Sequence, residues 1–111
     1  MNPTRRLVVL LLAAVLLSAC STVKVGRDFD LTGFTARIER GVTTQADVRS
    51  WLGAPASTGT SLGTDGQRYE EWGYFFGEGS LNDASNARLK QLQIKFDTDG
   101  RVRGYNWSQS K

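Results

Sequence analysis

The sequence predicts an α+β domain in two layers, with two N-terminal helices packed on a three-stranded antiparallel sheet in the order α-α-β-β-β. Three observations support this fold class. Residues 30–52 carry apolar side chains at helical spacing, residues 69–108 carry them at alternate positions, and turn residues separate the alternating segments. Such a sheet can bury one face only if the helix pair covers it.

The first helix is expected over Asp30–Arg40. Leu31, Phe34 and Ile38 are spaced so that they share one face of it. Gly41 follows at a position that suits a left-handed C-terminal cap. This helix therefore has a defined apolar face and a defined end.

The second helix has clearer boundary signals. Thr44 suits the N-cap, and Asp47 three residues later completes a short capping box. Gly53 is expected to be a left-handed cap. The apolar stripe of this helix consists of Val48, Trp51 and Leu52. The signal that ends it consists of Gly53 and Pro55.

Beyond Pro55 the apolar period changes from helical to alternating, which predicts strands. In order, we expect a weak strand at Ser57–Ser61, a turn at 63–66, a strand at Tyr69–Phe76, a loop at Gly77–Ala87, a strand around 91–96, a turn at Asp99-Gly100 and a strand at Arg101–Ser108. The expected core is Phe34, Ile38, Val48, Leu52, Trp72, Tyr74, Leu92, Ile94, Phe96 and Val102.

The N-terminus has the pattern of a lipoprotein signal peptide. Arg5 and Arg6 precede the apolar run Leu7–Leu17, and Ser18 and Ala19 precede Cys20, the only cysteine. The alternative is a permanent membrane anchor, but eleven apolar residues are fewer than the roughly 20 that a spanning helix needs. An intramolecular disulfide is impossible with one cysteine. We therefore expect lipid attachment at Cys20.

This interpretation divides the chain into a signal peptide at 1–19, a lipidated tether at 20–30 and a folded domain at 31–111. The resemblance of the N-terminal segment to those of bacterial lipoproteins implies a diacylglyceryl group on the sulfur of Cys20 and an acyl group on its amine. Several acyl chains make a stable anchor where one is marginal. Removing residues 1–19 from the 111 leaves 92, enough for one small domain.

Charge and residue types exclude several function classes. Without the signal peptide, twelve basic side chains face eleven acidic ones, interspersed along the chain, so no nucleic-acid partner is expected. The absence of histidine, with the single thiol committed to lipid, argues against an enzyme, and we expect no cofactor and no small-molecule substrate. Asp97 and Asp99 before Gly100 suggest a calcium loop, but further ligands are missing and a hairpin turn explains them better, so no metal site is expected.

Four residues are candidates for a partner-binding surface. Strand alternation places Phe75 opposite the face of Trp72. If Val102 points inward, the same rule turns Arg103, Tyr105 and Trp107 outward, where grouped aromatic side chains would need a partner to cover them. The alternatives are a strand bulge, which would change these orientations, and coverage by the tether.

Three segments resemble the SmpA/OmlA, or BamE-like, family of outer-membrane lipoproteins. They are Gly41-Val42-Thr43-Thr44-Gln45-Ala46-Asp47-Val48 followed by Leu52-Gly53-Ala54-Pro55, then Glu71-Trp72-Gly73-Tyr74-Phe75-Phe76, and the terminal hairpin from Leu92 to Val102. The resemblance implies an α-α-β-β-β domain on the periplasmic face of the outer membrane. The Gly77–Ala87 stretch and the short tether depart from the family pattern.

The function that this resemblance implies is that of a non-enzymatic interaction module in β-barrel protein assembly or envelope maintenance. Its partners would be other envelope lipoproteins or a barrel-assembly subunit, besides the outer membrane itself through the anchor. Ser21 is not the Asp that signals inner-membrane retention in enterobacteria, so sorting to the outer membrane is expected. The alternative is a periplasmic inhibitor-like or ligand-binding lipoprotein module, because the arrangement also resembles the repeats of β-lactamase-inhibitor proteins.

Overall fold

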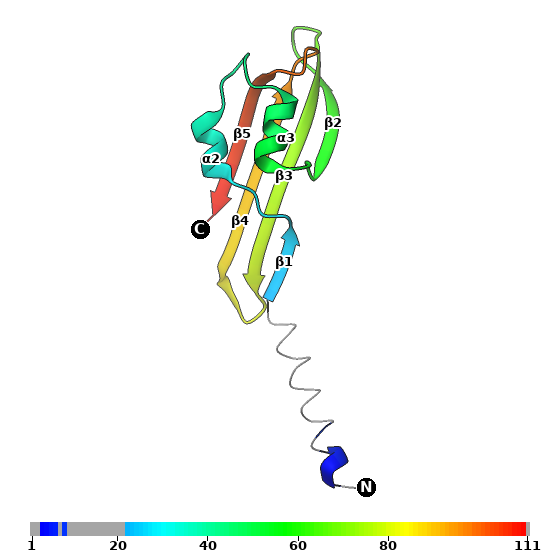
Figure 1. Cartoon of the computed structure of the whole chain (residues 1–111), viewed down its shortest axis with the longest axis vertical. Helices are drawn as coiled ribbons and strands as arrows, with labels where there is room; N and C mark the ends of the chain where they lie inside the picture. Colours follow the sequence, from blue (N-terminus) through cyan, green and yellow to red (C-terminus); the bar gives the residue numbers. More distant parts are fainter. Residues whose placement is uncertain (1–2, 7, 9–21, 111) are drawn as a thin grey trace.

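The computed structural model describes residues 3–6, 8 and 22–110, and Cys20 lies outside these residues. From residue 22 onward two helices cross one face of a sheet (Figure 1). The elements are β1 (Thr22–Gly26), α2 (Leu31–Arg37), α3 (Gln45–Leu52), β2 (Ser57–Leu62), β3 (Arg68–Ser80), β4 (Asp83–Phe96) and β5 (Val102–Ser110). None of the helices among the described residues combines the length and the apolar composition of a membrane span.

All five strands belong to one antiparallel sheet, so the expected three-stranded sheet is wrong. The order is β1-β3-β4-β5, and β2 also pairs with β3. Because β4 occupies one edge of β3, β1 and β2 share the other edge, β2 along residues 68–73 and β1 along residues 76–80. The domain is therefore mostly sheet, with two short helices on one face (Figure 1).

Two segments cause the difference from the prediction. Thr22–Gly26, expected to be tether, forms β1, and most of the expected loop Gly77–Ala87 continues β3 and β4 to a tight turn near Leu81. Glycine, asparagine and aspartate, which recur in the Gly77–Ala87 segment, disfavour strands locally. Here β1 and β4 pair with the glycine-containing end of β3 on both sides, and these hydrogen bonds override the local preference.

The helix boundaries follow their capping groups. Asp30 caps α2 by accepting a hydrogen bond from the backbone N–H of Gly33, and the helix ends at Arg37, three residues earlier than expected. Thr44 and Asp47 form the predicted capping box of α3. Gly53 ends α3 with the expected positive φ of 82°, but its ψ of −165° lies outside the left-handed helical region.

The core lies between the two helices and the sheet. Nine of the ten predicted core residues are buried, and Ile38, at the end of α2, is partly buried and packs against them. Phe29, Leu31 and Phe76 complete the set of buried hydrophobic residues among those described. The ring of Trp72 meets that of Phe96 at 4.8 Å, and Arg49 of α3 lies over Trp72 at 5.1 Å. Tertiary packing therefore fixes α3 to the middle of the sheet.

Candidate interaction surfaces

The expected lipid-attachment site is close to the sheet in sequence. Thr22, which opens β1, follows Cys20 by two residues, so their Cα atoms lie at most about 7 Å apart. If residues 20–30 were a fully extended tether, as the sequence predicts, the Cα atoms of Cys20 and Phe34 could lie roughly 45 to 50 Å apart. A lipid on Cys20 would therefore hold the β1 end of the sheet, rather than a distant linker, at the membrane.

A β-bulge in β5 decides where the C-terminal aromatic residues point. Lys95 pairs with Gly104 while the next residue, Phe96, pairs with Val102, so Arg103 is an extra residue in β5. One extra residue reverses the alternation beyond it. Tyr105 therefore lies opposite Ile94 on the helix-covered face, like Val102.

The expected position of Tyr105 and Trp107 on the outer face is therefore wrong, and the bulge alternative is correct. Tyr105 meets the ring of Phe34 in α2 edge-on, at 5.3 Å, and Trp107 lies opposite Leu92. Both rings are still accessible, since 36% of Tyr105 and 52% of Trp107 are exposed. The sequence was thus right about their exposure and wrong about their face.

Arg103 belongs to the hairpin rather than to an aromatic group. Its Nε donates to Asp97 Oδ2 at 2.9 Å, and the backbone N–H groups of Asp99 and Arg101 donate to Asp97 Oδ1. These bonds, with that from Arg101 first, lower the pKa of Asp97. Asp97 is therefore engaged by the turn, as the hairpin interpretation predicts, and Gly100 adopts the positive φ of that turn.

The outer edge of β5 is partly unpaired. Gly41 N–H donates to the carbonyl of Val102, and Arg40 Nε donates to that of Arg103. Beyond Arg103, no other described segment pairs with this edge. The unpaired stretch carries Tyr105 and Trp107 and presents free backbone donors and acceptors, the feature to which an added strand binds.

Phe75 lies on the other face of the sheet, apart from Tyr105 and Trp107. It contributes to an exposed group of apolar side chains, here called the apolar patch, at the end of the sheet formed by β1, β3 and β4. These side chains surround a shallow groove of about 380 Å³. The apolar patch consists of Val23, Val25, Phe75, Leu81 and Leu89.

Glycines form the floor of this groove. Gly77 pairs with Val25 on one side and Leu89 on the other, and Gly79 pairs with Val23. A Cβ atom on Gly77 would lie 3.1 Å from a methyl group of Leu89 and 3.5 Å from the ring of Phe75. The missing side chains thus leave the groove open between rows of larger apolar residues.

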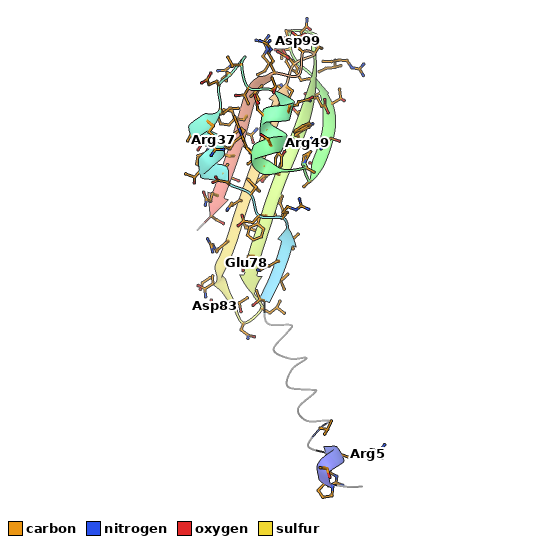
Figure 2. The ribbon with its side chains drawn as sticks, viewed as in Figure 1. Arg5, Arg37, Arg49, Glu78, Asp83 and Asp99 are labelled. Atoms are coloured by element: carbon orange, nitrogen blue, oxygen red, sulfur yellow. The ribbon has the colours of Figure 1, made fainter. Side chains whose placement is uncertain are left out.

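The opposite face of the same strands is covered and charged. Phe29 packs there against Tyr74 at 5.7 Å, and Lys90 bonds both the carboxylate of Asp28 at 2.6 Å and the Phe29 carbonyl. Figure 2 places Glu78 at this end of the sheet, where it pairs with Lys24 at 3.8 Å. At this end, no described segment covers the apolar outer face, whereas the opposite face is covered and charged.

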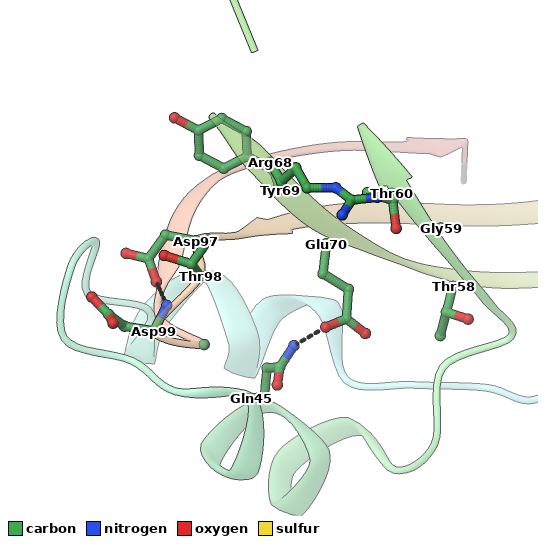
Figure 3. Close-up of a pocket in the computed structure, with 11 residues that line it drawn as sticks. Gln45, Thr58, Gly59, Thr60, Arg68, Tyr69, Glu70, Asp97, Thr98 and Asp99 are labelled. Carbon is green, nitrogen blue, oxygen red and sulfur yellow. Dashed lines mark hydrogen bonds between the residues drawn. The ribbon is translucent and has the colours of Figure 1, made fainter. Parts of the chain in front are cut away.

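A cavity of about 730 Å³, larger than the groove of the apolar patch, opens at the other end of the sheet and has a polar lining (Figure 3). Glu70 Oε2 accepts a hydrogen bond from Gln45 Nε2 at 2.8 Å, and Oε1 accepts one from Trp72 Nε1 at 3.1 Å. The bond from Trp72, followed by that from Gln45, lowers the pKa of Glu70. No group of three metal-binding side chains occurs among the described residues. The Glu70 carboxylate in this cavity thus joins β3 to α3 through its hydrogen bond with Gln45.

Comparisons of the chain with models of protein families, with curated proteins and with solved structures find no match. The functional argument therefore depends on the surfaces themselves. Of these, sequence reasoning missed the apolar patch apart from Phe75. The sequence pattern that could have predicted this patch is the alternation of Val23 and Val25 on either side of Lys24, together with glycine at positions 77 and 79.

Proposed function

We propose that the protein is an outer-membrane lipoprotein, anchored through Cys20 on the periplasmic face, that acts as a non-enzymatic interaction module in β-barrel protein assembly or envelope maintenance. The lipoprotein signal-peptide pattern that ends at Cys20 supports the anchor, and the resemblance of three segments to the BamE-like family supports the assembly role. The observation that carries the interaction role is the unpaired edge of β5 with its two exposed aromatic side chains.

The edge suits a partner that adds an extended segment to the sheet. Main-chain hydrogen bonds would supply affinity without strict sequence requirements, and side-chain contacts would supply specificity. Tyr105 and Trp107 project to the same face, and aromatic side chains of this kind commonly anchor protein interfaces. Other envelope lipoproteins or a barrel-assembly subunit are the partners we propose.

Trp107→Ala tests the partner surface in the full-length, membrane-bound protein. Affinity purification after cross-linking in intact membranes should recover barrel-assembly or lipoprotein partners with the wild type and much less of them with the variant. Removing an interface anchor typically weakens binding by about 2 kcal/mol or more, roughly thirtyfold. Ser108→Ala, on the same strand and exposed on the other face, is the matched control.

Circular dichroism separates loss of binding from loss of fold. Trp107 is half exposed, so its truncation should lower the melting temperature only slightly. Tyr105→Ala is less suitable, because it also removes the contact with buried Phe34. A Trp107→Ala variant that melts normally and retains every partner would contradict the proposed surface.

The anchor has an independent test. Cys20→Ala should abolish labelling by radioactive fatty acid and release the protein from the membrane fraction, and labelling that persists in this variant would refute attachment at Cys20. For the wild type, a density gradient should place the protein with the outer membrane. A peak with the inner membrane would contradict the proposed localisation.

A further inference from the structure

The apolar patch lies at the end of the sheet nearest to Cys20 in the sequence. Val23 and Val25 follow Cys20 by three and five residues, so even an extended chain places their Cα atoms within about 10 and 18 Å of the cysteine. Both side chains are exposed on the outer face of β1. A surface this close to a lipid anchor is held near the bilayer wherever the rest of the domain lies.

From this placement we propose that the apolar patch rests against the bilayer that holds the Cys20 lipid, with its side chains at the boundary between headgroups and acyl chains. The inference depends on the lipid anchor of the proposed function. It adds a second, non-covalent contact that fixes the orientation of the domain on the membrane.

The outer face changes character along the strands. Phe75 and Leu89 are apolar. Further from Cys20, the outer face continues through Gly73, which has no side chain, to the polar side chains of Glu71, Gln91 and Gln93. Gln93 Nε2 reaches Glu71 at 3.4 Å, which makes a polar surface of this region. The apolar residues thus form a limited zone at the end near the anchor, as contact with a membrane boundary requires.

The size of the patch favours the bilayer over a second copy of this chain. A stable protein interface uses roughly 20 to 30 residues on each side, whereas the patch has five apolar side chains and polar neighbours. A contact that a covalent anchor already holds in place needs far less area, because the tether raises the effective concentration of the surface at the membrane.

The backbone and the opposite face are compatible with this orientation. At Gly77 and Glu78, β3 is paired with both β1 and β4, so its polar backbone groups already have partners beneath the apolar side chains. The charged pairs Lys24–Glu78 and Asp28–Lys90 lie on the face turned away from the lipid. Helices α2 and α3 also lie on that face (Figure 1).

The test uses the lipidated protein reconstituted in phosphatidylcholine vesicles, with an environment-sensitive fluorophore on Leu89→Cys. The diacylglyceryl group blocks the Cys20 sulfur as a thioether, and the chain has no other cysteine, so the introduced cysteine is the only free thiol. Nitroxide lipids labelled at shallow acyl depth should quench this probe. The control is Arg88→Cys, one residue away on β4, exposed and on the opposite face. We expect at least about threefold stronger quenching at position 89, because interfacial contact reaches only about 5–10 Å into the bilayer.

Equal quenching at positions 88 and 89 would overturn the proposal. So would a blue-shifted Leu89→Cys probe that nitroxide lipids do not quench and whose shift grows with protein density, since a second copy would then cover the patch. These results differ from a failure of the anchor, which appears beforehand as absent fatty-acid labelling and no recovery with vesicles. Melting of each labelled variant verifies that the domain remains folded.

Discussion

Gly53→Ala probes the junction where α3 turns into the sheet. Gly53 has φ 82° and ψ −165°, a combination that residues with a Cβ rarely adopt, and its carbonyl accepts a hydrogen bond from the Tyr74 hydroxyl at 2.9 Å. An added Cβ would meet only a guanidinium nitrogen of Arg27, at 3.7 Å. The cost of the substitution is therefore conformational and not steric crowding by neighbours.

The magnitude follows from two opposing effects. Holding an L-residue in this backbone conformation costs up to about 3 kcal/mol of unfolding free energy. Replacing glycine also restricts the unfolded chain, which stabilises the folded state by about 0.5–1 kcal/mol. The net loss is about 2 kcal/mol of unfolding free energy. For a domain of this size, each kcal/mol lowers the melting temperature by about 4–8 °C, so we expect a decrease of roughly 8–16 °C.

The assay is thermal melting and urea unfolding by circular dichroism, with Gly59→Ala as the control. Gly59 lies in β2 without positive φ, and a Cβ there would meet nothing within 4 Å. Its substitution should change stability by about 0.5 kcal/mol or less. If Gly53→Ala had the same melting temperature as the control and the wild type, position 53 would not hold a positive φ in solution. That result would refute the conformational explanation.

Three further predictions concern stability. Burial raises the pKa of Tyr74 to about 12. Because a tyrosine in the unfolded chain ionises near pH 10, the free energy of unfolding should fall as pH rises from about 10 to 12. Tyr74→Phe should remove this part of the alkaline transition measured by circular dichroism. The pKa of Asp97 is lowered by its hydrogen bonds, first that from Arg101, so its contribution is present above the unfolded pKa of about 3.9 and lost below it; Asp97→Asn should flatten the acid limb of urea midpoint against pH, and an unchanged limb would contradict this. Thr44→Ala removes the cap of α3 and should cost about 1 kcal/mol in urea unfolding, whereas Thr44→Ser should retain most of it.

The sequence alone determined the elements whose signals are local. The capping box of Thr44 and Asp47 places the start of α3, and the Asp99-Gly100 turn occurs where its residues predict it. Alternation assigned Trp72 and Ile94 to the core, and both are buried. These features depend on residues a few positions apart, so the pattern contains the information that decides them.

Only the tertiary structure decided the extent of the sheet and the face of each C-terminal aromatic residue. Thr22–Gly26 is a strand because the glycine-containing end of β3, fifty or more residues away in the chain, supplies its hydrogen bonds. The bulge at Arg103 is likewise fixed by pairing with β4, and it turns Tyr105 toward Phe34. Strand pairing and register are set by contacts between distant segments, and a single extra residue reverses every side chain beyond it.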